Sequence, residues 1–184
     1  MTVDLTTRYL GLDLANPLVA SASPLTGELE SLEALEAAGV AAVVLPSLFE
    51  EQIEQESLMV HLGLEYGTAY QPEAVGGYFP DLDDYNTGPD DYLRLIVDAK
   101  AALSIPVIGS LNGVSPGGWT TYARHIEQAG ADALELNIYL VAADPSIAGP
   151  EIESRYIGLV EEVRSTVGIP LSVKIGPYFS SPGH

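Results

Sequence analysis

The sequence contains no cysteine, so disulfide bonds, thiolate metal sites and a cysteine nucleophile are excluded. It also lacks a phosphate-binding P-loop, a Gly-x-Gly-x-x-Gly turn, a Ser-His-Asp set and a cluster of metal ligands, so the chemistries that need them have no support. Residues 1–16 contain no long apolar run and carry Asp4 and Asp13, which argues against a signal peptide or a membrane span. We therefore expect a cytoplasmic protein.

Basic residues are scarce. Seven lysines and arginines stand against 26 aspartates and glutamates, which gives a formal net charge of -19. Such a surface repels phosphate backbones and anionic lipid headgroups, so neither nucleic acid nor a membrane is an expected partner. We expect a small-molecule substrate as the partner and leave self-association into a homodimer open. The charge is equally compatible with a role in solubility alone.

The composition is that of a globular domain. The 184 residues are 47% hydrophobic, with 13 prolines and 18 glycines. A chain of this length buries a substantial core, and this composition is typical of an ordinary folded protein. We expect residues 1–184 to form a single domain.

Two stretches of the chain share a pattern. Residues 36–45 and 127–136 both contain Glu-x-Ala-Gly, then a small residue and an apolar run, which is typical of a helix end followed by a strand. Gly39 and Gly130 stand where a helix end favours a residue that tolerates positive φ. A second pair, 104–111 and 167–174, has Ile-Pro at the start of a strand, where proline is tolerated.

Strands and helices alternate along the chain. Apolar stripes at helical spacing predict helices over residues 28–38, 92–103, 115–129 and 150–163. A short hairpin and five strands are predicted over residues 9–14, 17–23, 41–47, 106–112, 133–139 and 170–176. Residues 48–90 form a long insert between the second strand and its helix, and such inserts are usually lids, binding loops or disordered.

This alternation predicts an α/β fold with a parallel sheet covered by helices. Two architectures share it, a five-stranded doubly wound sheet and a partial (β/α)8 TIM barrel. The length favours the doubly wound sheet. The partial barrel is favoured because no helix follows the fifth strand and because the hairpin over residues 9–14 would plug the bottom of a barrel. We expect the partial barrel, with about five parallel strands.

Polar residues gather where the predicted strands end, which is the edge at which ligands bind in both architectures. The first strand ends in Ser21-Ala22-Ser23 and the second in Ser47. Asn112 and Asn137 end the third and fourth strands, and each amide offers a donor and an acceptor to the edge of a heterocycle. Asparagine also closes turns between strands and helices, so this alternative stays open.

Lys174 lies in the fifth strand, which looks buried from its sequence. A buried ammonium needs an anionic or carbonyl partner. If it faces the interior of a barrel, it would meet a bound anion or the electron-rich end of a flavin. The alternative is a salt bridge, and Glu135 on the neighbouring strand is the candidate.

Four tracts resemble one family. The run from Tyr9-Leu10-Gly11-Leu12 through Asn16-Pro17 to Ser21-Ala22-Ser23 resembles the opening of the dihydroorotate dehydrogenases and of the related dihydropyrimidine dehydrogenase flavin domain. Glu135-Leu136-Asn137 is similar to the Glu-Leu-Asn of the fourth barrel strand in that family, and residues 173–179 to the Val-Lys-Leu-x-Pro-Tyr-Phe of the fifth. Residues 86–93 are similar to the tract before its second helix, and the match is collinear over the whole chain.

The resemblance implies a (β/α)8 barrel that binds FMN at the carboxyl ends of its strands and oxidises dihydroorotate to orotate, a CH-CH oxidation in pyrimidine biosynthesis. FMN carries the hydride chemistry, and the protein supplies orientation and electrostatics. In this chain the implied cofactor contacts are Ser21, Ala22, Ser23, Ser47, Asn112, Asn137 and Lys174. The implied substrate contacts are Asn86 and Asn137.

The sequence also departs from the family pattern. Pro46 stands where the family has a lysine, and Phe79-Pro80 where a substrate-binding asparagine is expected. Ile138-Tyr139-Leu140 replaces the stretch with a serine or cysteine base, and a phenol with its reference pKa of about 10 is a weak base. The last three strands, which hold the flavin phosphate in the family, have no counterpart. We therefore assign no catalytic residue.

The sequence leaves three hypotheses. The first is a truncated, weakly active or inactive flavoprotein of the dihydroorotate dehydrogenase type. The second is a non-catalytic half-barrel that associates with itself or with a second chain, because an open sheet edge is an aggregation hazard. The third is a binder of another small molecule on a flavodoxin-like sheet, which the missing terminal helix disfavours.

Overall fold

The computed structural model of the protein describes residues 3–49, 89–112, 118–138, 140 and 143–176. Within them, five parallel strands form one sheet: β3 (Val19–Ala20), β4 (Ala42–Phe49), β5 (Val107–Asn112), β6 (Ala133–Ile138) and β7 (Leu171–Ile175). The helices are α1 (Leu29–Ala37), α3 (Pro89–Ala102), α4 (Gly118–Gln128) and α5 (Gly149–Thr166). A short 3-10 helix, η1 (Pro24–Thr26), precedes α1. None of the described helices is long and apolar enough to cross a membrane.

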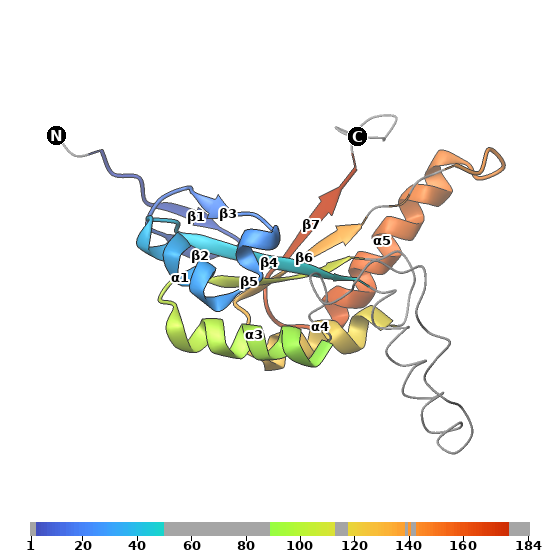
Figure 1. Cartoon of the computed structure of the whole chain (residues 1–184). Helices are drawn as coiled ribbons and strands as arrows, with labels where there is room; N and C mark the ends of the chain where they lie inside the picture. The colour runs from blue at the N-terminus through green and yellow to red at the C-terminus, as the bar shows by residue number, and fades with distance from the viewer. Residues whose placement is uncertain (1–2, 50–88, 113–117, 139, 141–142, 177–184) are drawn as a thin grey trace, which may run out of the picture.

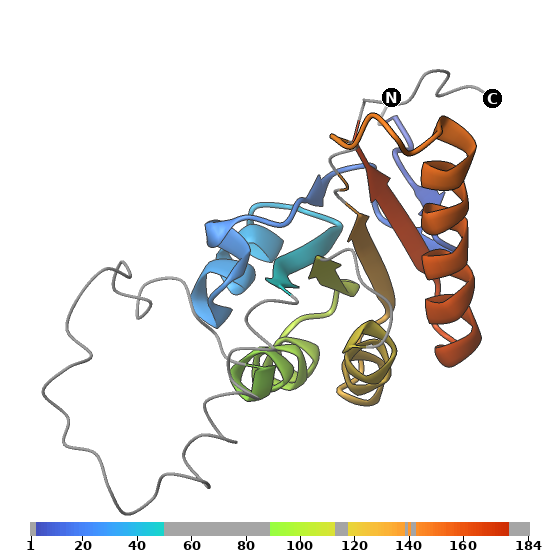
Figure 2. The ribbon, with the colours of Figure 1, turned by 90° about the vertical axis from the view of Figure 1, so that its right-hand side faces the viewer.

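The strands lie side by side in the same order as they follow along the chain. Connections between parallel strands are right-handed, so a run of connections in one direction places every helix on the same face of the sheet. A doubly wound sheet instead reverses its order at a switch point and has helices on both faces. Figure 1 and Figure 2 show the helices along the outside of a curved sheet. The described chain is a half-barrel, which confirms the partial barrel and excludes the flavodoxin-like sheet.

The two faces of the sheet pack against different elements. On the outer face, residues such as Val43, Val107 and Leu134 join the main core with Ile96 and Ile126 of the helices. Side chains alternate between the faces along a strand, so their neighbours face the interior. A smaller inner cluster consists of Val44, Ile108 and Ala133, with Leu10, Leu12, Val19 and Ala22 packed against it. The inner face is therefore apolar at the end where these strands begin.

The inner cluster is covered by a hairpin of β1 (Thr7–Tyr9) and β2 (Leu12–Leu14). Its turn needs positive φ at both central residues, and Leu10 and Gly11 have φ of 53° and 77°. This conformation costs a leucine about 1 kcal/mol or more, and Leu10 packs on the inner cluster. The predicted hairpin is confirmed, and it covers the apolar end of the barrel interior.

The repeated sequence pattern has a structural counterpart. Gly39 and Gly130 follow α1 and α4 with φ of 95° and 100°, as predicted. The N–H of the residue after each glycine bonds back into the last turn of the helix, from Val40 to the Leu35 carbonyl at 3.2 Å and likewise from Ala131 to Ile126 at 3.3 Å. This six-to-one hydrogen bond is typical of a helix that ends at a left-handed glycine.

The glutamate of each repeat holds the loop before a more distant strand. Glu36 accepts hydrogen bonds from the Ser104 N–H at 2.8 Å and from its hydroxyl at 2.6 Å. Glu127 accepts them from the N–H groups of Gly168 at 2.8 Å and Ile169 at 3.0 Å. Each loop leads into a strand that begins with Ile-Pro. The two sequence repeats therefore belong to the same structural arrangement, which occurs twice: a glutamate near a helix end binds the loop before a later strand.

The first strand is shorter than expected. It was predicted over residues 17–23, but β3 ends at Ala20. The Ser23 N–H donates to the Thr26 hydroxyl at 3.2 Å, and this hydroxyl donates to the Ser23 carbonyl at 2.9 Å. These bonds turn the chain into η1, so the extension of the strand to Ser23 is wrong. Most of the predicted insert, residues 50–88, lies outside the described residues, and its first and last residues belong to β4 and α3.

Candidate functional site

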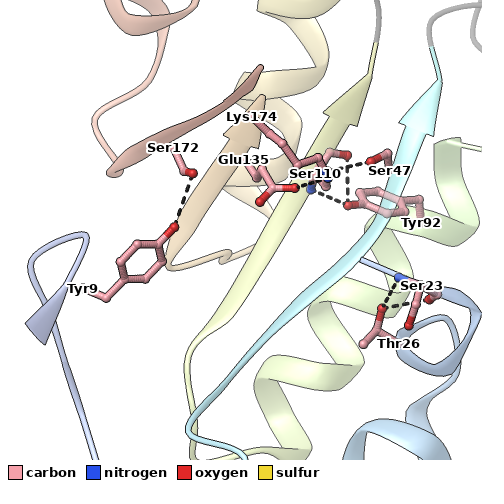
Figure 3. A network of polar contacts seen from close by, with 9 residues as sticks. All are labelled: Tyr9, Ser23, Thr26, Ser47, Tyr92, Ser110, Glu135, Ser172 and Lys174. Carbon is pink, nitrogen blue, oxygen red and sulfur yellow. Dashed lines mark hydrogen bonds and ion pairs between the residues drawn. The ribbon is translucent and has the colours of Figure 1, made fainter. Parts of the chain in front are cut away.

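The inner face becomes polar toward the carboxyl ends of the strands. Strand pairing aligns two rows of side chains across the sheet, between the inner cluster and the carboxyl ends of the strands. The first polar row is Ser47, Ser110, Glu135 and Ser172, and the second polar row is Asn112, Asn137 and Lys174, with Phe49 beside Asn112. The Tyr9 hydroxyl of the hairpin lies 3.4 Å from the Ser172 hydroxyl (Figure 3). The hairpin thus reaches the first polar row and covers the apolar part of the face below it.

The first polar row is closely packed at β4 and β5. The hydroxyls of Ser47 and Ser110 lie 2.8 Å apart, and Ser110 is fully buried. Between Val44 and Ser47 the pairing of β4 with β5 shifts by one residue. This is a β-bulge, and it contains Pro46, which has no N–H for the ladder.

Tyr92, on α3, satisfies the backbone next to this bulge. Its buried hydroxyl accepts a hydrogen bond from the Ser110 N–H at 2.7 Å and donates one to the Ser110 carbonyl at 3.2 Å (Figure 3). Burial raises the pKa of the Tyr92 phenol well above its usual range, the contact with Ser110 opposes this, and the charge of Glu135 adds to it. Tyr92 therefore stays protonated and acts as a structural donor.

Lys174 points to the inner face, where its ammonium lies 2.8 Å from the carboxylate of Glu135 (Figure 3). The side chain of Glu135 is 15% exposed and that of Lys174 is 48% exposed. The salt bridge considered from the sequence is thus confirmed. An ammonium carries three N–H donors, so this contact leaves Lys174 with donors for a ligand.

The fifth strand is not the buried strand that its sequence suggested. Val173 and Ile175 are 39% and 49% exposed. β7 pairs with β6 and is the last strand of the sheet, so one side of it is open within the described chain. Apolar β-branched residues favour a strand but do not distinguish an edge from a centre.

The other predicted cofactor contacts lie in different surroundings. Asn112 and Asn137 are aligned partners at the ends of β5 and β6, both partly buried. Ser21 is exposed, Ala22 packs on the inner cluster, and the backbone of Ser23 bonds to Thr26. Asn86 lies outside the described residues. The structure therefore brings Ser47, Asn112, Asn137 and Lys174 onto one face, and their role in binding stays a prediction.

Sequence analysis did not assign Ser110, Glu135 or Ser172 as site residues, although it considered Glu135 as the salt-bridge partner of Lys174. A usable signal was present, because β5, β6 and β7 each carry two polar residues separated by one apolar residue: Ser110 and Asn112, Glu135 and Asn137, Ser172 and Lys174. A spacing of two places both side chains of each pair on one face. No group of three or more metal-ligating residues occurs among the described residues.

The curated proteins whose sequences are similar to this chain are dihydroorotate dehydrogenases. The chain is 26% identical to the catalytic subunit of dihydroorotate dehydrogenase B (NAD(+)) of Thermoplasma volcanium, over 97% of this chain and 56% of that protein. A protein of Aeropyrum pernix assigned as dihydroorotate dehydrogenase A (fumarate) is 33% identical over 107 residues, or 55% of this chain and 34% of that protein. No family profile matches the chain.

Solved structures with a similar arrangement belong to other families. A dihydrodipicolinate synthase of Agrobacterium tumefaciens matches with a TM-score of 0.43 and 17% identity, over 85% of this chain and 43% of that one. This likeness carries no information on function. The family resemblance of the motifs is confirmed by the sequence relatives: the chain is a distant homologue of the dihydroorotate dehydrogenases and spans about half the length of the Thermoplasma protein that it matches.

Proposed function

We propose that the chain is a flavoprotein of the dihydroorotate dehydrogenase type, which holds the ring of FMN against the polar rows and oxidises dihydroorotate weakly or not at all. The observation that carries this proposal is the position of Lys174. Its ammonium lies on the inner face, and its residue is aligned with Asn137, which is aligned with Asn112. Ligands of such sheets bind outside the carboxyl ends of the strands.

The residues present fit the ring of a flavin. One edge of that ring is an imide, with two carbonyl oxygens and an N–H between them. Asn112 and Asn137 offer amide donors and acceptors, and Lys174 offers a cationic donor. Bound FMN would accept the hydride from the substrate, and the chain's own residues would orient the ring and complement its electron-rich edge.

Weak activity is expected because a proton-abstracting group is missing near Asn137. Residues 138–143 are Ile, Tyr, Leu, Val, Ala and Ala, without a serine or cysteine. Glu135 is the carboxylate of the polar rows, and it is bound to Lys174 at 2.8 Å. An ion-paired carboxylate is a poor base, because abstracting a proton removes its charge from the pair. A role in pyrimidine biosynthesis is proposed on the family relation alone.

A titration of the purified chain with FMN, followed by flavin fluorescence, tests this proposal. We expect saturable binding at one FMN per chain. Lys174→Met should weaken it ten- to a hundredfold, since a hydrogen bond from a charged group contributes about 1.5–3 kcal/mol. Lys100→Met is the matched control, because it removes the other lysine, which pairs with Asp132 on the outer side of the sheet. Absence of saturable binding, or equal effects of both changes, would refute the proposal.

A second candidate function is a half-barrel that associates through β7. Val173 and Ile175 are exposed on its outer face, and Ile157 of the neighbouring helix α5 is 59% exposed. An open parallel edge with apolar side chains is a surface for pairing with another strand. Self-association should appear in sedimentation equilibrium at rising concentration and be lost in V173K/I175K. Val97→Lys, a change at an exposed valine on α3, should leave it intact. A monomer at every concentration would reject self-association.

A further inference from the structure

The bulge in β4 decides which of its side chains reach the inner face. Between Val44 and Ser47 the strand contains two residues, while the aligned part of β5 contains one. Side chains alternate along a regular strand, and an extra residue reverses this alternation beyond the bulge. Leu48 accordingly packs in the outer core. Phe49 therefore faces inward, where it is aligned with Asn112.

Phe49 presents an aromatic ring at the carboxyl end of the inner face. It is 39% exposed, although β4 has a strand on either side. On one of these sides, β3 pairs with β4 through Val19 and Ala20, and their partners Ala42 and Val43 lie well before the level of Phe49. The inner cluster, by contrast, lies at the opposite end of the face and is covered by the hairpin. The ring of Phe49 is thus apolar surface that a flat ligand can cover.

Phe49 extends the second polar row on the side of β4. The row then follows the strand order: Phe49 on β4, Asn112 on β5, Asn137 on β6 and Lys174 on β7. Neighbouring strands lie about 4.8 Å apart, so the extended row is about 14 Å long. The surface that a ligand meets is therefore apolar at one end, lined by amides in the middle and cationic at the other end.

We propose that Phe49 is a positioning residue, which sets the direction in which the flavin ring lies along this extended row. The isoalloxazine has an apolar dimethylbenzene end and an imide end. The apolar end lies on the ring of Phe49, where two aromatic rings stack or meet edge to face. The imide end lies at Asn137 and Lys174, with Asn112 between the two ends.

The opposite direction is disfavoured on the side of β4. It would press the imide carbonyls onto Phe49, where they lose water without gaining a hydrogen bond. The apolar end would then cover the ammonium of Lys174, which points to the inner face. The two ends of the flavin therefore match the two ends of the row in one direction. This inference rests on the proposed function for the identity of the ring.

Lumiflavin and lumazine are suitable probes, because both carry the imide edge and neither carries a phosphate, but only lumiflavin has the dimethylbenzene ring. Titration of the full chain, followed by ligand fluorescence, should show lumiflavin bound about tenfold more tightly, since its additional ring buries apolar area on Phe49. Phe49→Ala should weaken lumiflavin binding about five- to tenfold and leave lumazine binding within about twofold of wild type.

Three further variants separate the contact from effects on the fold. Phe49→Tyr keeps the aromatic ring and should keep the preference for lumiflavin. Ile157→Ala removes an exposed apolar side chain of α5, on the outer side of the sheet, and should change neither affinity. Lys174→Met should weaken both probes by the same factor, because both bind through the imide edge.

Equal weakening of both probes in Phe49→Ala, or unchanged lumiflavin binding in this variant, would overturn the inference. FMN binding separates it from the proposed function. FMN and lumiflavin bound without dependence on Phe49, but weakened by Lys174→Met, overturn only the inference. A preference for lumiflavin that depends on Phe49, without binding of FMN, overturns only the flavoprotein proposal. Absence of binding of all three ligands overturns both.

Discussion

Tyr92 and Ser110 form a paired contact, in which one phenol hydroxyl binds both the N–H and the carbonyl of the same strand residue. The contact joins helix α3 to the strand beside the β-bulge. It lies directly behind the first polar row, where the Ser110 hydroxyl meets that of Ser47 at 2.8 Å. The shape of the polar rows therefore depends on a helix residue on the other side of the sheet.

Removing this hydroxyl should destabilise the fold. Tyr92→Phe leaves two buried backbone groups without the partner they have now, and each such group costs about 1–3 kcal/mol. We expect a loss of about 2–4 kcal/mol in the free energy of unfolding, measured with urea. Tyr9→Phe is the control, since the Tyr9 hydroxyl makes an exposed contact of 3.4 Å and its loss should cost less than about 0.5 kcal/mol. Equal effects of the two changes would contradict this account of Tyr92.

Two glycines should respond to alanine in opposite ways. A Cβ on Gly109 would lie 2.5 Å from Cγ2 of Ile126, so β5 and α4 would have to separate. Overpacking of this kind costs about 1–3 kcal/mol. Gly158 lies in α5 with open space around a Cβ, and alanine there should stabilise the helix by about 1 kcal/mol. Thermal unfolding should give a lower midpoint than wild type for Gly109→Ala and a higher one for Gly158→Ala. An unchanged midpoint in Gly109→Ala would show that β5 and α4 are not in close contact.

The contact between Glu36 and Ser104 should make the free energy of unfolding depend on pH. Hydrogen bonds from the Ser104 hydroxyl and then from its N–H lower the pKa of the Glu36 carboxyl below its usual value. A carboxyl group whose pKa is lower in the folded than in the unfolded state stabilises the fold. This contribution is fully present above the unfolded pKa of about 4.3 and is lost as the pH falls through the folded pKa. Glu36→Gln should therefore be less stable than wild type at pH 7, with a smaller difference at pH 3.

The control for this experiment is Glu33→Gln, a change on the exposed face of the same helix. It should show no such pH-dependent difference. A Glu36→Gln deficit that is equal at both pH values would mean that the carboxylate charge does not matter to the contact.

Local patterns predicted most of the fold. The helix ends at Gly39 and Gly130 were predictable, because a glycine that follows a helical pattern is by itself a signal for a residue with positive φ at the helix end. The strand order followed from the alternation of elements, since right-handed connections leave few arrangements. The strand predicted over residues 41–47 was close to β4, although the bulge at Pro46 was not foreseen.

What was missed depends on contacts between distant residues. The bonds from Ser104 to Glu36 and from Gly168 to Glu127 span 68 and 41 residues, so no local window contains them. The exposure of Val173 and Ile175 follows from the position of β7 at the edge of the sheet, which its own apolar sequence does not reveal. The polar rows were only partly recognised, because alignment across strands requires the register.

The binding of a flat ring beside Lys174 is tested most directly by NMR of methylated lysines. The chain has two lysines, so reductive ¹³C-methylation, which keeps their charge, gives one signal for each, assigned with Lys100→Arg and Lys174→Arg. Addition of FMN should shift the Lys174 signal and leave that of Lys100 in place. A shift at Lys100 alone, or no shift at either lysine at saturating FMN, would contradict the account.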